Sequence, residues 1–348
     1  MGPYSIGVSH YPLFRKNPYN VLMLEAIQNA GVLTLALTGS LPELLRFLFG
    51  RHNYRILHLH WVSMFVTSAL LPTAVLKMCL FHTGLLIWRF RGRKIVWTVH
   101  NLVNHERKRL WLERLHSRLT ASAADAVLVH GGRARTLVAR TFDVPLKKIH
   151  IIPHGNYVSK LPEPVPLTTH EGVRFLCFGL IRRYKGIPAL LSAFSDLQGS
   201  HTLQIAGEIR DTILMDEIMR QAICDSRVRL RLEFLPDTML AKCLAECDVV
   251  VLPYLDILTS GSLLMALSAA RASIVPHAGV IEDYTDDTIS FLYNVAEPKG
   301  LLGALRRATE SNDLAERGVR ARLRAAQFDW TTIGYSLKRL YEQIGAFS

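Results

Sequence analysis

Cysteine is scarce in this sequence, and its few cysteines form no recognisable metal-binding or disulfide pattern. Five occur among 348 residues, an odd number, and no two are spaced as C-x-x-C. Cys243 and Cys247 lie one helical turn apart, which favours packing in a core over a pair of metal ligands. These observations exclude a small disulfide-stabilised secreted domain and agree with a reducing cytoplasm.

We also expect no secretory leader in this sequence. Such a leader has basic residues ahead of an apolar segment and a cleavage site between small residues. Here Arg15 and Lys16 come after Pro12 rather than before an apolar segment of that kind. We therefore expect a protein that is not exported by that route.

No uninterrupted apolar run is long enough to cross a bilayer. The segment from Val62 to Trp88 is almost wholly apolar, but it contains Pro72, Lys77 and His82. A spanning helix needs about 20 consecutive apolar residues, so these interruptions argue against one. Four basic residues follow directly, Arg89, Arg91, Arg93 and Lys94. The pattern predicts a pair of helices, either in an ordinary core or, as we favour, buried or interfacial with a basic rim.

Acidic residues are few in the first half of the chain. Residues 1–165 contain 21 Lys and Arg against 7 Asp and Glu, a net charge of +14, whereas residues 166–348 contain 20 against 22, a net charge of −2. A basic half indicates an acidic partner: nucleic acid, an anionic membrane surface or a phosphorylated substrate. Aromatic residues are not interleaved with the basic ones, which argues against nucleic acid.

What is present is a regular alternation of predicted strands and helices. This pattern is typical of parallel sheets covered by helices, that is, an α/β fold of doubly wound, Rossmann-like domains. Prolines at 162, 164 and 166 separate two such halves, predicting domains at 1–165 and 166–330. The expected strands of the first half are 4–9, 32–37, 55–60, 95–100, 126–130 and 149–152, and those of the second begin at 173, 202, 228 and 249.

Several predicted strands of the first half end in histidine or another polar residue. In parallel sheets, ligands bind outside the carboxyl ends of the strands. We therefore expect one crevice to collect these residues, which are His60 and Trp61, His100 and Asn101, His105 and Glu106, and His154 and Asn156.

The most informative segment is Val173 to Gly186. An apolar strand stops at Gly179, where the chain can turn sharply, and a helix follows. Arg182 and Lys185 lie three residues apart and could face the same crevice as the helix N-terminus, an arrangement that suits a diphosphate. A surface turn with two solvated cations is the alternative.

A second helix start follows the strand that ends at Pro253 and Tyr254. Ser260, Gly261 and Ser262 open this helix. A serine there can cap the helix, and Gly261 allows close approach of a ligand to the backbone. The segment therefore predicts either a simple cap or a contact with a second phosphate oxygen or a sugar hydroxyl.

Taken together, these motifs resemble the GT-B glycosyltransferases, and more closely the xanthan-type mannosyltransferases. The segments that carry the resemblance are Asn17-Pro18-Tyr19, Leu57 to Trp61, Thr98 to Leu102, His105-Glu106, Phe178 to Arg182 with Tyr184-Lys185-Gly186, and Ser260-Gly261 with Ala266-Leu267-Ser268. The resemblance implies two domains facing across a cleft, with the last helix, 331–348, packing back on the first domain. It also implies inverting transfer of mannose from GDP-mannose to a polyprenyl-diphosphate-linked oligosaccharide.

That resemblance implies a place and partners as well. They are a nucleotide sugar, a lipid-linked glycan acceptor and an anionic membrane surface, at the cytoplasmic side of the inner membrane, in exopolysaccharide assembly. The chain would be peripheral (monotopic) there, and we expect no nucleic acid partner, no cofactor and no metal requirement.

Two acidic motifs known from related enzymes are missing. Retaining GT-B enzymes usually carry two glutamates, whose places here are taken by Ile257 and Met265, so an inverting enzyme is expected. The Asp-x-Asp pair with which the other glycosyltransferase fold binds a cation is absent too, and Arg182 with Lys185 can replace that cation. Asp256 could contact the ribose or the sugar, or be solvated.

The resemblance and the chemistry together assign roles. Inverting transfer needs a general base and cations that hold the leaving diphosphate. We predict Glu106 as the base, with His100 orienting a substrate; His60, His100 and His105 are the alternatives for the base. The donor-binding residues are predicted to be Gly179, Arg182, Lys185, Tyr254, Ser260, Gly261, Ser262 and His154. The acceptor-side residues are predicted to be Asn17, Tyr19, His60, Trp61, Asn101 and His105.

Three other hypotheses stay open at this stage. A transferase could use a UDP-sugar or another glycan acceptor. A nucleotide-sugar epimerase shares the architecture but needs no apolar, basic acceptor face. An inactive membrane scaffold would tolerate the missing glutamates, although it would not need Arg182 and Lys185.

Overall fold

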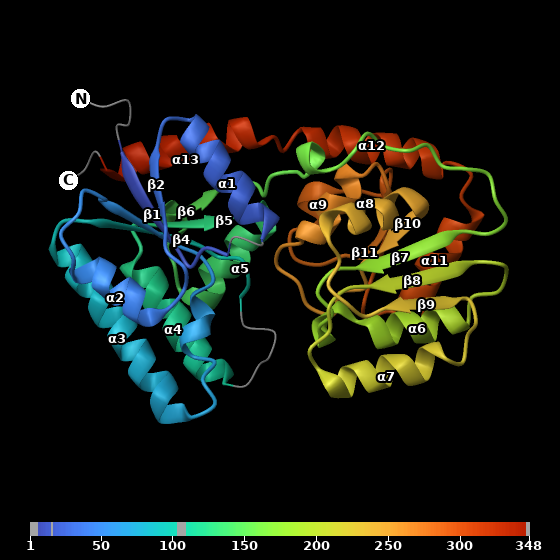
Figure 1. The fold of residues 1–348 in the computed structure, drawn as a ribbon, viewed down its shortest axis with the longest axis horizontal. Coiled ribbons are helices and arrows are strands. Elements are labelled where there is room, and N and C mark those ends of the chain that lie inside the picture. The colour runs from blue at the N-terminus through green and yellow to red at the C-terminus, as the bar shows by residue number, and fades with distance from the viewer. Residues whose placement is uncertain (1–5, 15–16, 103–108, 346–348) are drawn as a thin grey trace. The chain divides into compact units, whose positions relative to one another are not determined.

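The protein folds into two compact α/β units. A computed structural model describes residues 6–14, 17–102 and 109–345 (Figure 1). The first unit comprises Met1–Gly155 together with Phe328–Ser348, and the second comprises Asn156–Gln327. The second unit begins at Asn156. It therefore includes the proline-rich segment, where we had predicted the first domain to end at residue 165. The end of the chain contributes to the first unit.

The first unit contains a six-stranded parallel sheet in the order β2-β1-β3-β4-β5-β6. Its first two strands occupy one edge, and the chain then crosses to the other side of β1 to form β3. This reversal makes the gap between the carboxyl ends of β1 and β3 a topological switch point, where such sheets bind ligands. The strands are β1 (Gly7–Tyr11), β2 (Leu33–Ala36), β3 (Ile56–Leu59), β4 (Lys94–Thr98), β5 (Ala126–Val129) and β6 (Ile149–Ile151).

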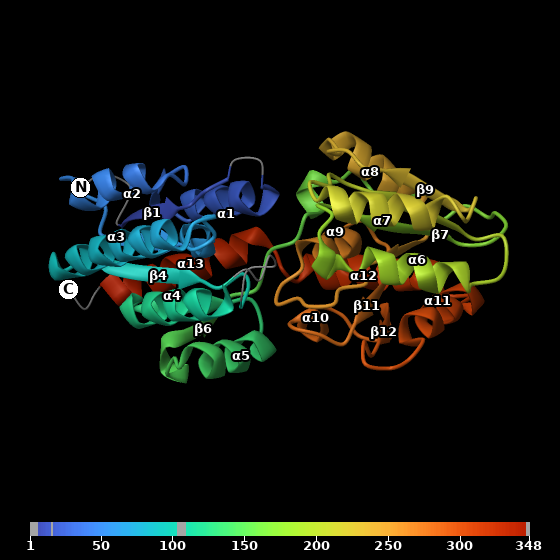
Figure 2. The same cartoon turned by 90° about the horizontal axis from the view of Figure 1, so that it is seen from below.

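Helices cover both faces of this sheet (Figures 1 and 2). One face is packed by α1 and α13, whose side chains Met23, Ile27 and Leu337 are buried against the strand residues Val8 and Val96. The helices are α1 (Pro18–Asn29), α2 (Leu41–Phe49), α3 (Leu71–Phe90), α4 (Leu110–Ala123), α5 (Gly132–Phe142) and α13 (Trp330–Gly345), with a 3₁₀ turn η1 (Val62–Phe65).

The predicted pair of helices between 62 and 88 is wrong in form. After the short turn η1, a single helix, α3, runs from Leu71 to Phe90 without a break. Pro72 does not interrupt it because proline is tolerated in the first helical turn, where its missing N–H has no partner to lose. By length and composition, α3 is also able to span a membrane, and 33% of its most apolar window is buried in this fold.

The second unit contains another six-stranded parallel sheet, in the order β12-β11-β10-β7-β8-β9. Its switch point lies between β7 and β10, which are neighbours in the sheet although β8 and β9 lie between them in the chain. The strands are β7 (Arg174–Phe178), β8 (Thr202–Ala206), β9 (Val228–Arg231), β10 (Val249–Val251), β11 (Ala272–Pro276) and β12 (Ser290–Tyr293). Two doubly wound parallel sheets are therefore confirmed.

The second unit extends beyond the elements that we predicted. The strands β11 and β12 are buried throughout, and helices follow them before the chain returns to the first unit. The helices of this unit are α6 (Ile187–Ser195), α7 (Thr212–Ala222), α8 (Asp237–Glu246), α9 (Gly261–Ser268), α10 (Ile281–Tyr284), α11 (Gly300–Glu310) and α12 (Leu314–Ala326). They lie on both faces of the sheet (Figure 1).

Candidate active site

In the second unit, the predicted anion-binding segment lies at the switch point between β7 and β10. Gly179 follows β7 with φ +97°, and a Cβ there would lie 2.9 Å from Lys185 Nζ. Gly186, at φ +67°, ends the 3₁₀ turn η4 (Arg183–Lys185), and a Cβ there would lie 2.1 Å from the Pro253 carbonyl oxygen. Both positions need glycine because backbone and ammonium groups crowd into the space where a side chain would stand.

Lys185 is the central cation of this segment. Its side chain is buried, and Nζ donates to the Phe178 carbonyl oxygen at 3.1 Å and lies 3.5 Å from Ser262 Oγ. Burial lowers the pKa of Lys185. Among the residues that the structure describes, no carboxylate forms an ion pair with it. A buried ammonium without a counter-ion is costly, so an anionic ligand would stabilise it.

The neighbouring Arg183 shows the opposite arrangement. Its guanidinium pairs with Asp211 at 3.0 Å and with Glu217 at 3.7 Å, and it is largely exposed. Arg182 is half-buried and precedes η4, where its carbonyl oxygen accepts from the Lys185 N–H at 3.0 Å. These two cations, two residues apart, therefore have different roles: Arg183 is neutralised by the protein, and Lys185 is not.

The second predicted helix start lies beside this segment. Ser260 caps α9, accepting from the Leu263 N–H at 3.0 Å, so the predicted cap is confirmed. The same hydroxyl lies 2.7 Å from Tyr254 Oη, and the Lys185 ammonium lies 5.8 Å from the Tyr254 ring. With Gly261 as the first residue of α9 and Ser262 beside Lys185, the structure brings together the predicted donor-binding residues of this unit.

In the first unit, histidines from five strands gather at the carboxyl ends of those strands. Each lies in the last two residues of a parallel strand or within three residues after it, and each is buried. Tyr19 of α1 lies among them, with ring centroids 4.7 to 6.5 Å from four of them. We call this set the imidazole cluster; it consists of His10, His58, His60, His100, His130 and His154.

Hydrogen bonds connect three members of the imidazole cluster into a chain. His10 Nδ1 lies 3.3 Å from His60 Nε2, and His60 Nδ1 lies 3.3 Å from His100 Nε2. Burial lowers the pKa of His10 to about 3 and lowers those of His60 and His100 well below the usual value. These imidazoles are therefore neutral near pH 7, and in each hydrogen-bonded pair one nitrogen donates and the other accepts.

Three members of the cluster could also act as metal ligands. His10, His58 and His60 each offer a nitrogen within 4.8 Å of the others. Both His58 nitrogens, however, already have partners at 2.7 Å, Tyr341 Oη and Thr98 Oγ1. Hydrogen bonding within the protein thus accounts for the position of His58 without an ion, and the absence of a metal requirement stays a prediction.

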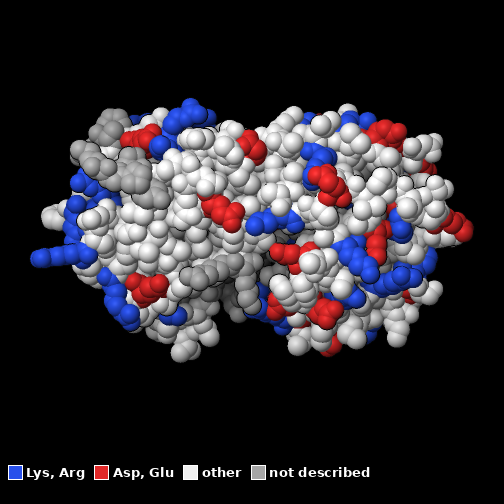
Figure 3. Space-filling view, turned by 45° about the horizontal axis from the view of Figure 1, so that its top comes forward, with Lys and Arg blue, Asp and Glu red and all other residues white. Residues whose placement is uncertain are grey.

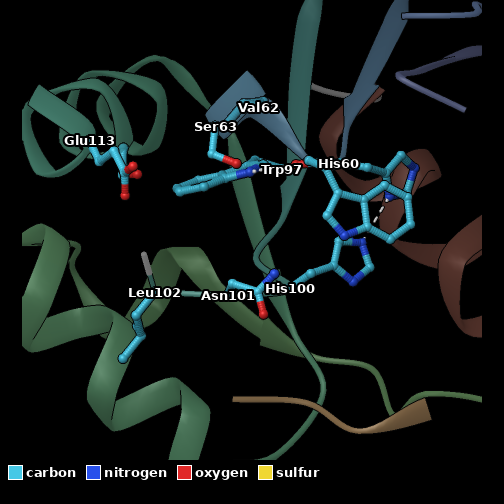
Figure 4. A pocket seen from close by; sticks show the side chains of 10 residues that line it. His60, Val62, Ser63, Trp97, His100, Asn101, Leu102 and Glu113 are labelled. Carbon is cyan, nitrogen blue, oxygen red and sulfur yellow. Dashed lines mark hydrogen bonds between the residues drawn. The ribbon is translucent and has the colours of Figure 1, made fainter. Parts of the chain in front are cut away.

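A pocket opens beside the imidazole cluster, within the first unit (Figure 4). It has an empty volume of about 370 Å³, open solvent included, and its lining residues come from the end of β3, η1, β4 and α4. Glu113 of α4 lines it and is 4% exposed. In Figure 4 its carboxylate points into the open space beside Trp97. The lining residues are His60, Trp61, Val62, Ser63, Trp97, His100, Asn101, Leu102, Glu113 and Ser117.

Sequence reasoning missed Glu113 and His10. Glu113 lies in the helical stretch predicted between the strands 95–100 and 126–130, where a glutamate usually faces solvent. His10 directly follows the strand predicted at 4–9 and belongs to no recognisable motif. The signal for Glu113 was its spacing: it lies on the same helix face as His116 and Thr120, which are also buried. An acidic residue on a buried helix face is unusual enough to mark a candidate site.

The predicted acceptor-side residues divide into three groups. Trp61 stacks on His100 at 4.2 Å, and both line the pocket with Asn101. Asn17 caps α1 by accepting from the Tyr19 N–H at 3.1 Å, which gives it a structural role. His105 and the predicted base Glu106 lie outside the described residues.

His154 belongs to a different unit from the other predicted donor-binding residues. It belongs to the first unit, where its ring packs against Tyr19 at 4.7 Å and its Nδ1 lies 2.8 Å from the Gly155 carbonyl oxygen. Asn156 caps a turn, accepting from the Val158 N–H at 3.1 Å. In the second unit, Ile257, at one of the two places where we expected no glutamate, is buried in the loop before α9.

Sequence comparison identifies relatives over most of the chain. Residues 172–311 match the family model described as glycosyl transferases group 1. Two curated proteins of Xanthomonas campestris pathovar campestris, both named GDP-mannose:glycolipid 4-beta-D-mannosyltransferase, are 30% identical over 299 and 300 residues. These matches cover 83% of this chain and 80% of each relative.

Solved structures resemble the whole chain at low sequence identity. HepE of Anabaena, in complex with UDP and glucose, has a TM-score of 0.74 at 14% identity and covers 97% of this chain and 100% of its own. Sucrose-phosphate synthase of Thermosynechococcus elongatus has a TM-score of 0.76 at 16% identity and covers 99% of this chain and 100% of its own. These likenesses confirm the predicted fold, that of the GT-B glycosyltransferases.

Proposed function

Because the chain belongs to the group 1 glycosyltransferase family, we propose that it transfers mannose from GDP-mannose to a polyprenyl-diphosphate-linked oligosaccharide, with inversion at the anomeric carbon. The names of its curated relatives support the mannosyl donor and a glycolipid acceptor. The reaction would serve exopolysaccharide assembly at the cytoplasmic face of the inner membrane, where the chain is peripheral.

The single observation that carries the donor assignment is the buried Lys185 ammonium. It lies at the switch point between β7 and β10, and its described partners are a carbonyl oxygen and a hydroxyl rather than a carboxylate. A donor diphosphate would supply the missing negative charge. Half-buried Arg182 adds a second cation, and together they stabilise the charge that develops on the leaving nucleoside diphosphate.

In this proposal, the first unit holds the acceptor and supplies the base. Inverting transfer requires a group that accepts the proton of the acceptor hydroxyl as the bond between the sugar and the phosphate breaks. Glu113 is the carboxylate that lines the pocket of the described first unit, and a carboxylate is better suited than His100, whose pKa burial lowers well below its usual value. The indole of Trp61 offers a face on which a sugar ring can stack.

The carboxylate Glu106, predicted as the base from sequence, remains a proposal to be tested alongside Glu113. It lies seven residues earlier in the chain. His100 keeps the proposed orienting role: its Nε2 is 3.3 Å from His60 Nδ1, a contact that holds its ring in place.

Isothermal titration of the purified chain with GDP, GDP-mannose, UDP and UDP-glucose, without metal and then with it, tests the donor. The proposal expects selective binding of the guanine nucleotides. Selective UDP binding would retain the transferase but replace the donor, and binding of none would contradict the role of Lys185. Transfer of labelled mannose to a lipid-diphosphate-linked oligosaccharide, with analysis of the anomeric product, then tests the acceptor and inversion.

A further inference from the structure

A second pocket of the first unit lies at the amino ends of the strands, whereas the imidazole cluster lies at their carboxyl ends. Its walls come from the segments that lead into the amino ends of β3 and β4. It encloses about 1140 Å³ of empty space, open solvent included. Four of its lining residues are cations and none is acidic; the lining consists of His52, Asn53, Tyr54, Arg55, Arg91, Gly92, Arg93 and Lys94. We call it the basic pocket.

The cations of the basic pocket are held in place. The Arg93 guanidinium donates to the His52 carbonyl oxygen at 3.3 Å and lies 4.5 Å from the centroid of the buried Trp88 ring. Arg91 donates to the Leu48 carbonyl oxygen at 2.8 Å. Backbone carbonyls thus fix two guanidinium groups and leave further N–H donors for a ligand.

Little negative charge balances these cations. Among the described residues, the one ion pair that a lining cation makes is between Lys94 and Asp125, at 3.9 Å. Burial, and next the nearby Arg91, lower the pKa of Arg93. The basic pocket is therefore a place where like charges repel one another and a bound anion would relieve that repulsion. In Figure 3, Lys and Arg gather at the end of the first unit that lies on the left.

The helix that leads into the basic pocket has an exposed apolar stripe. Exposed positions recur along α3 at helical spacing, and none of the stripe residues is charged. Phe90, the last residue of α3, is 96% exposed and is followed directly by Arg91. We call this face the α3 stripe; it consists of Pro72, Thr73, Leu76, Cys79, Leu80, Thr83, Leu86 and Phe90.

A single partner accounts for both features. An apolar stripe that ends beside a cluster of cations is complementary to an anionic bilayer, whose acyl region accepts the apolar side chains and whose phosphates accept the cations. The stripe spans about 20 Å between Leu76 and Phe90 at 1.5 Å per residue, long enough to lie along the interface. A solvated surface would not require the large apolar side chains to share one face.

We propose that the basic pocket binds the phosphate of an anionic membrane lipid while the α3 stripe lies in the interface of the same bilayer. The inference deepens the proposed function, because it names the surface by which the transferase reaches a lipid-linked acceptor. It places the phosphate-binding part of membrane attachment at the amino ends of the strands, whereas the proposed catalytic pocket lies at their carboxyl ends. Attachment and catalysis would therefore use different residues of the first unit.

Sedimentation of the full chain with vesicles tests this proposal, with phosphatidylcholine alone or mixed with phosphatidylglycerol. The wild type is expected to bind the anionic vesicles and to bind the neutral ones much more weakly. The double variant Arg55→Glu/Arg91→Glu should lose at least about twentyfold in binding, since each cation near such a surface contributes about fivefold. The matched control Arg220→Glu/Arg306→Glu makes the same charge change at exposed sites of the second unit and should bind as the wild type does.

A second pair of variants separates a lipid from free phosphate. Leu86→Asp/Phe90→Asp alters exposed side chains of the stripe and leaves the basic pocket intact; it should abolish vesicle binding. If that variant binds vesicles normally, or if inorganic phosphate at constant ionic strength displaces the wild type from them, the pocket takes a free anion and the proposal is wrong. Equal binding by the wild type and the Arg55→Glu/Arg91→Glu variant would also overturn it.

The readout does not depend on the transferase reaction. Vesicles are bound without donor or acceptor, and a GDP titration of the same preparations reports on Lys185. Loss of vesicle binding with normal GDP binding supports the attachment surface, whereas absent GDP binding with normal vesicle attachment contradicts only the donor assignment. Circular dichroism spectra and melting temperatures of all variants establish that they are folded.

Discussion

The ammonium of Lys185 lies 3.1 Å from the carbonyl oxygen of Phe178, the last residue of β7. This contact anchors the cation at the carboxyl end of the strand beside the switch point, where its neighbours are oxygen atoms without formal charge. Two residues beyond the solvent-facing Arg183, this lysine is buried without a carboxylate partner among the described residues, and the proposed donor diphosphate would supply the negative charge.

Replacement of Lys185 by alanine should weaken GDP-mannose binding by about tenfold to a hundredfold. The reason is that hydrogen bonds to charged groups contribute about 1.5–3 kcal/mol each. The melting temperature should stay the same or rise, because the variant removes an uncompensated buried charge. Isothermal titration and thermal unfolding measure the two effects.

Arg183→Ala is the matched control for that variant. It also removes one positive charge, two residues away, but the lost partners are Asp211 and Glu217. Donor binding should be unchanged. Similar losses of donor affinity in both variants would mean that general charge, rather than the position of Lys185, holds the donor.

Glu113→Gln should lower kcat by about a hundredfold to ten-thousandfold, the usual contribution of a positioned general base. The KM for the donor should change little, because the amide keeps the size of the carboxylate. The acidic limb of the pH–rate profile should disappear with the carboxyl group. Steady-state rates across pH, with melting temperatures, distinguish this loss from unfolding.

Glu106→Gln, measured in parallel, decides between the two carboxylates. We expect it to retain a larger share of activity than Glu113→Gln. A near-normal rate for Glu113→Gln with a collapsed rate for Glu106→Gln would restore the base assignment made from sequence.

Acid should unfold the first unit before the second. Burial lowers the pKa of His10 and His154 to about 3 and that of His130 to about 4. Below the unfolded-state pKa of about 6.5 the unfolded chain binds protons that the folded unit excludes, so stability falls as pH falls. At pH 5 each such histidine removes about 2 kcal/mol, or about 6 kcal/mol for the three. Above pH 6.5 these groups cause no change.

Tryptophan fluorescence measures that transition selectively. All five tryptophans, at 61, 88, 97, 111 and 330, belong to the first unit. As the pH is lowered, their fluorescence should change first. The loss of the second unit's helices, monitored by circular dichroism, should occur at a lower pH. A single coincident transition would show that the imidazole cluster does not set the acid stability.

Gly186→Ala should destabilise the second unit by about 1–3 kcal/mol and impair donor binding. The residue has φ +67°, and a Cβ would meet the Pro253 carbonyl oxygen at 2.1 Å. Gly303→Ala in α11 is the control, because a Cβ there meets no atom nearer than 3.9 Å and alanine favours a helix by about 0.5–1 kcal/mol. Thermal unfolding of both variants checks the opposite signs.

Turnover is expected to be independent of divalent metal. Cationic side chains supply the charge that a metal would otherwise provide to the leaving diphosphate. Activity after treatment with EDTA should equal that of the untreated enzyme. A loss that a divalent ion reverses would instead direct attention to His10, His58 and His60, whose nitrogens lie within 4.8 Å of one another.

Features that depend on short stretches of chain were predictable from the sequence. Alternation of apolar strands and amphipathic helices specified two parallel sheets, and Gly179 to Gly186 marked a turn that only glycine at two positions allows. The cap at Ser260 was equally local. These predictions succeeded because each rests on residues within about ten positions of one another, where backbone geometry and spacing suffice.

Which of those residues come into contact could be learned only from the folded chain. The pairing of β1 with β3 brings His10 within 3.3 Å of His60, fifty residues later, and the packing of α4 brings Glu113 to the pocket beside Trp97. Arg183 and Lys185 are nearly identical in sequence context, yet the fold supplies carboxylates to one and not to the other. The physical reason is that burial and the position of counter-charges depend on contacts between distant segments, which sheet order and helix packing fix together.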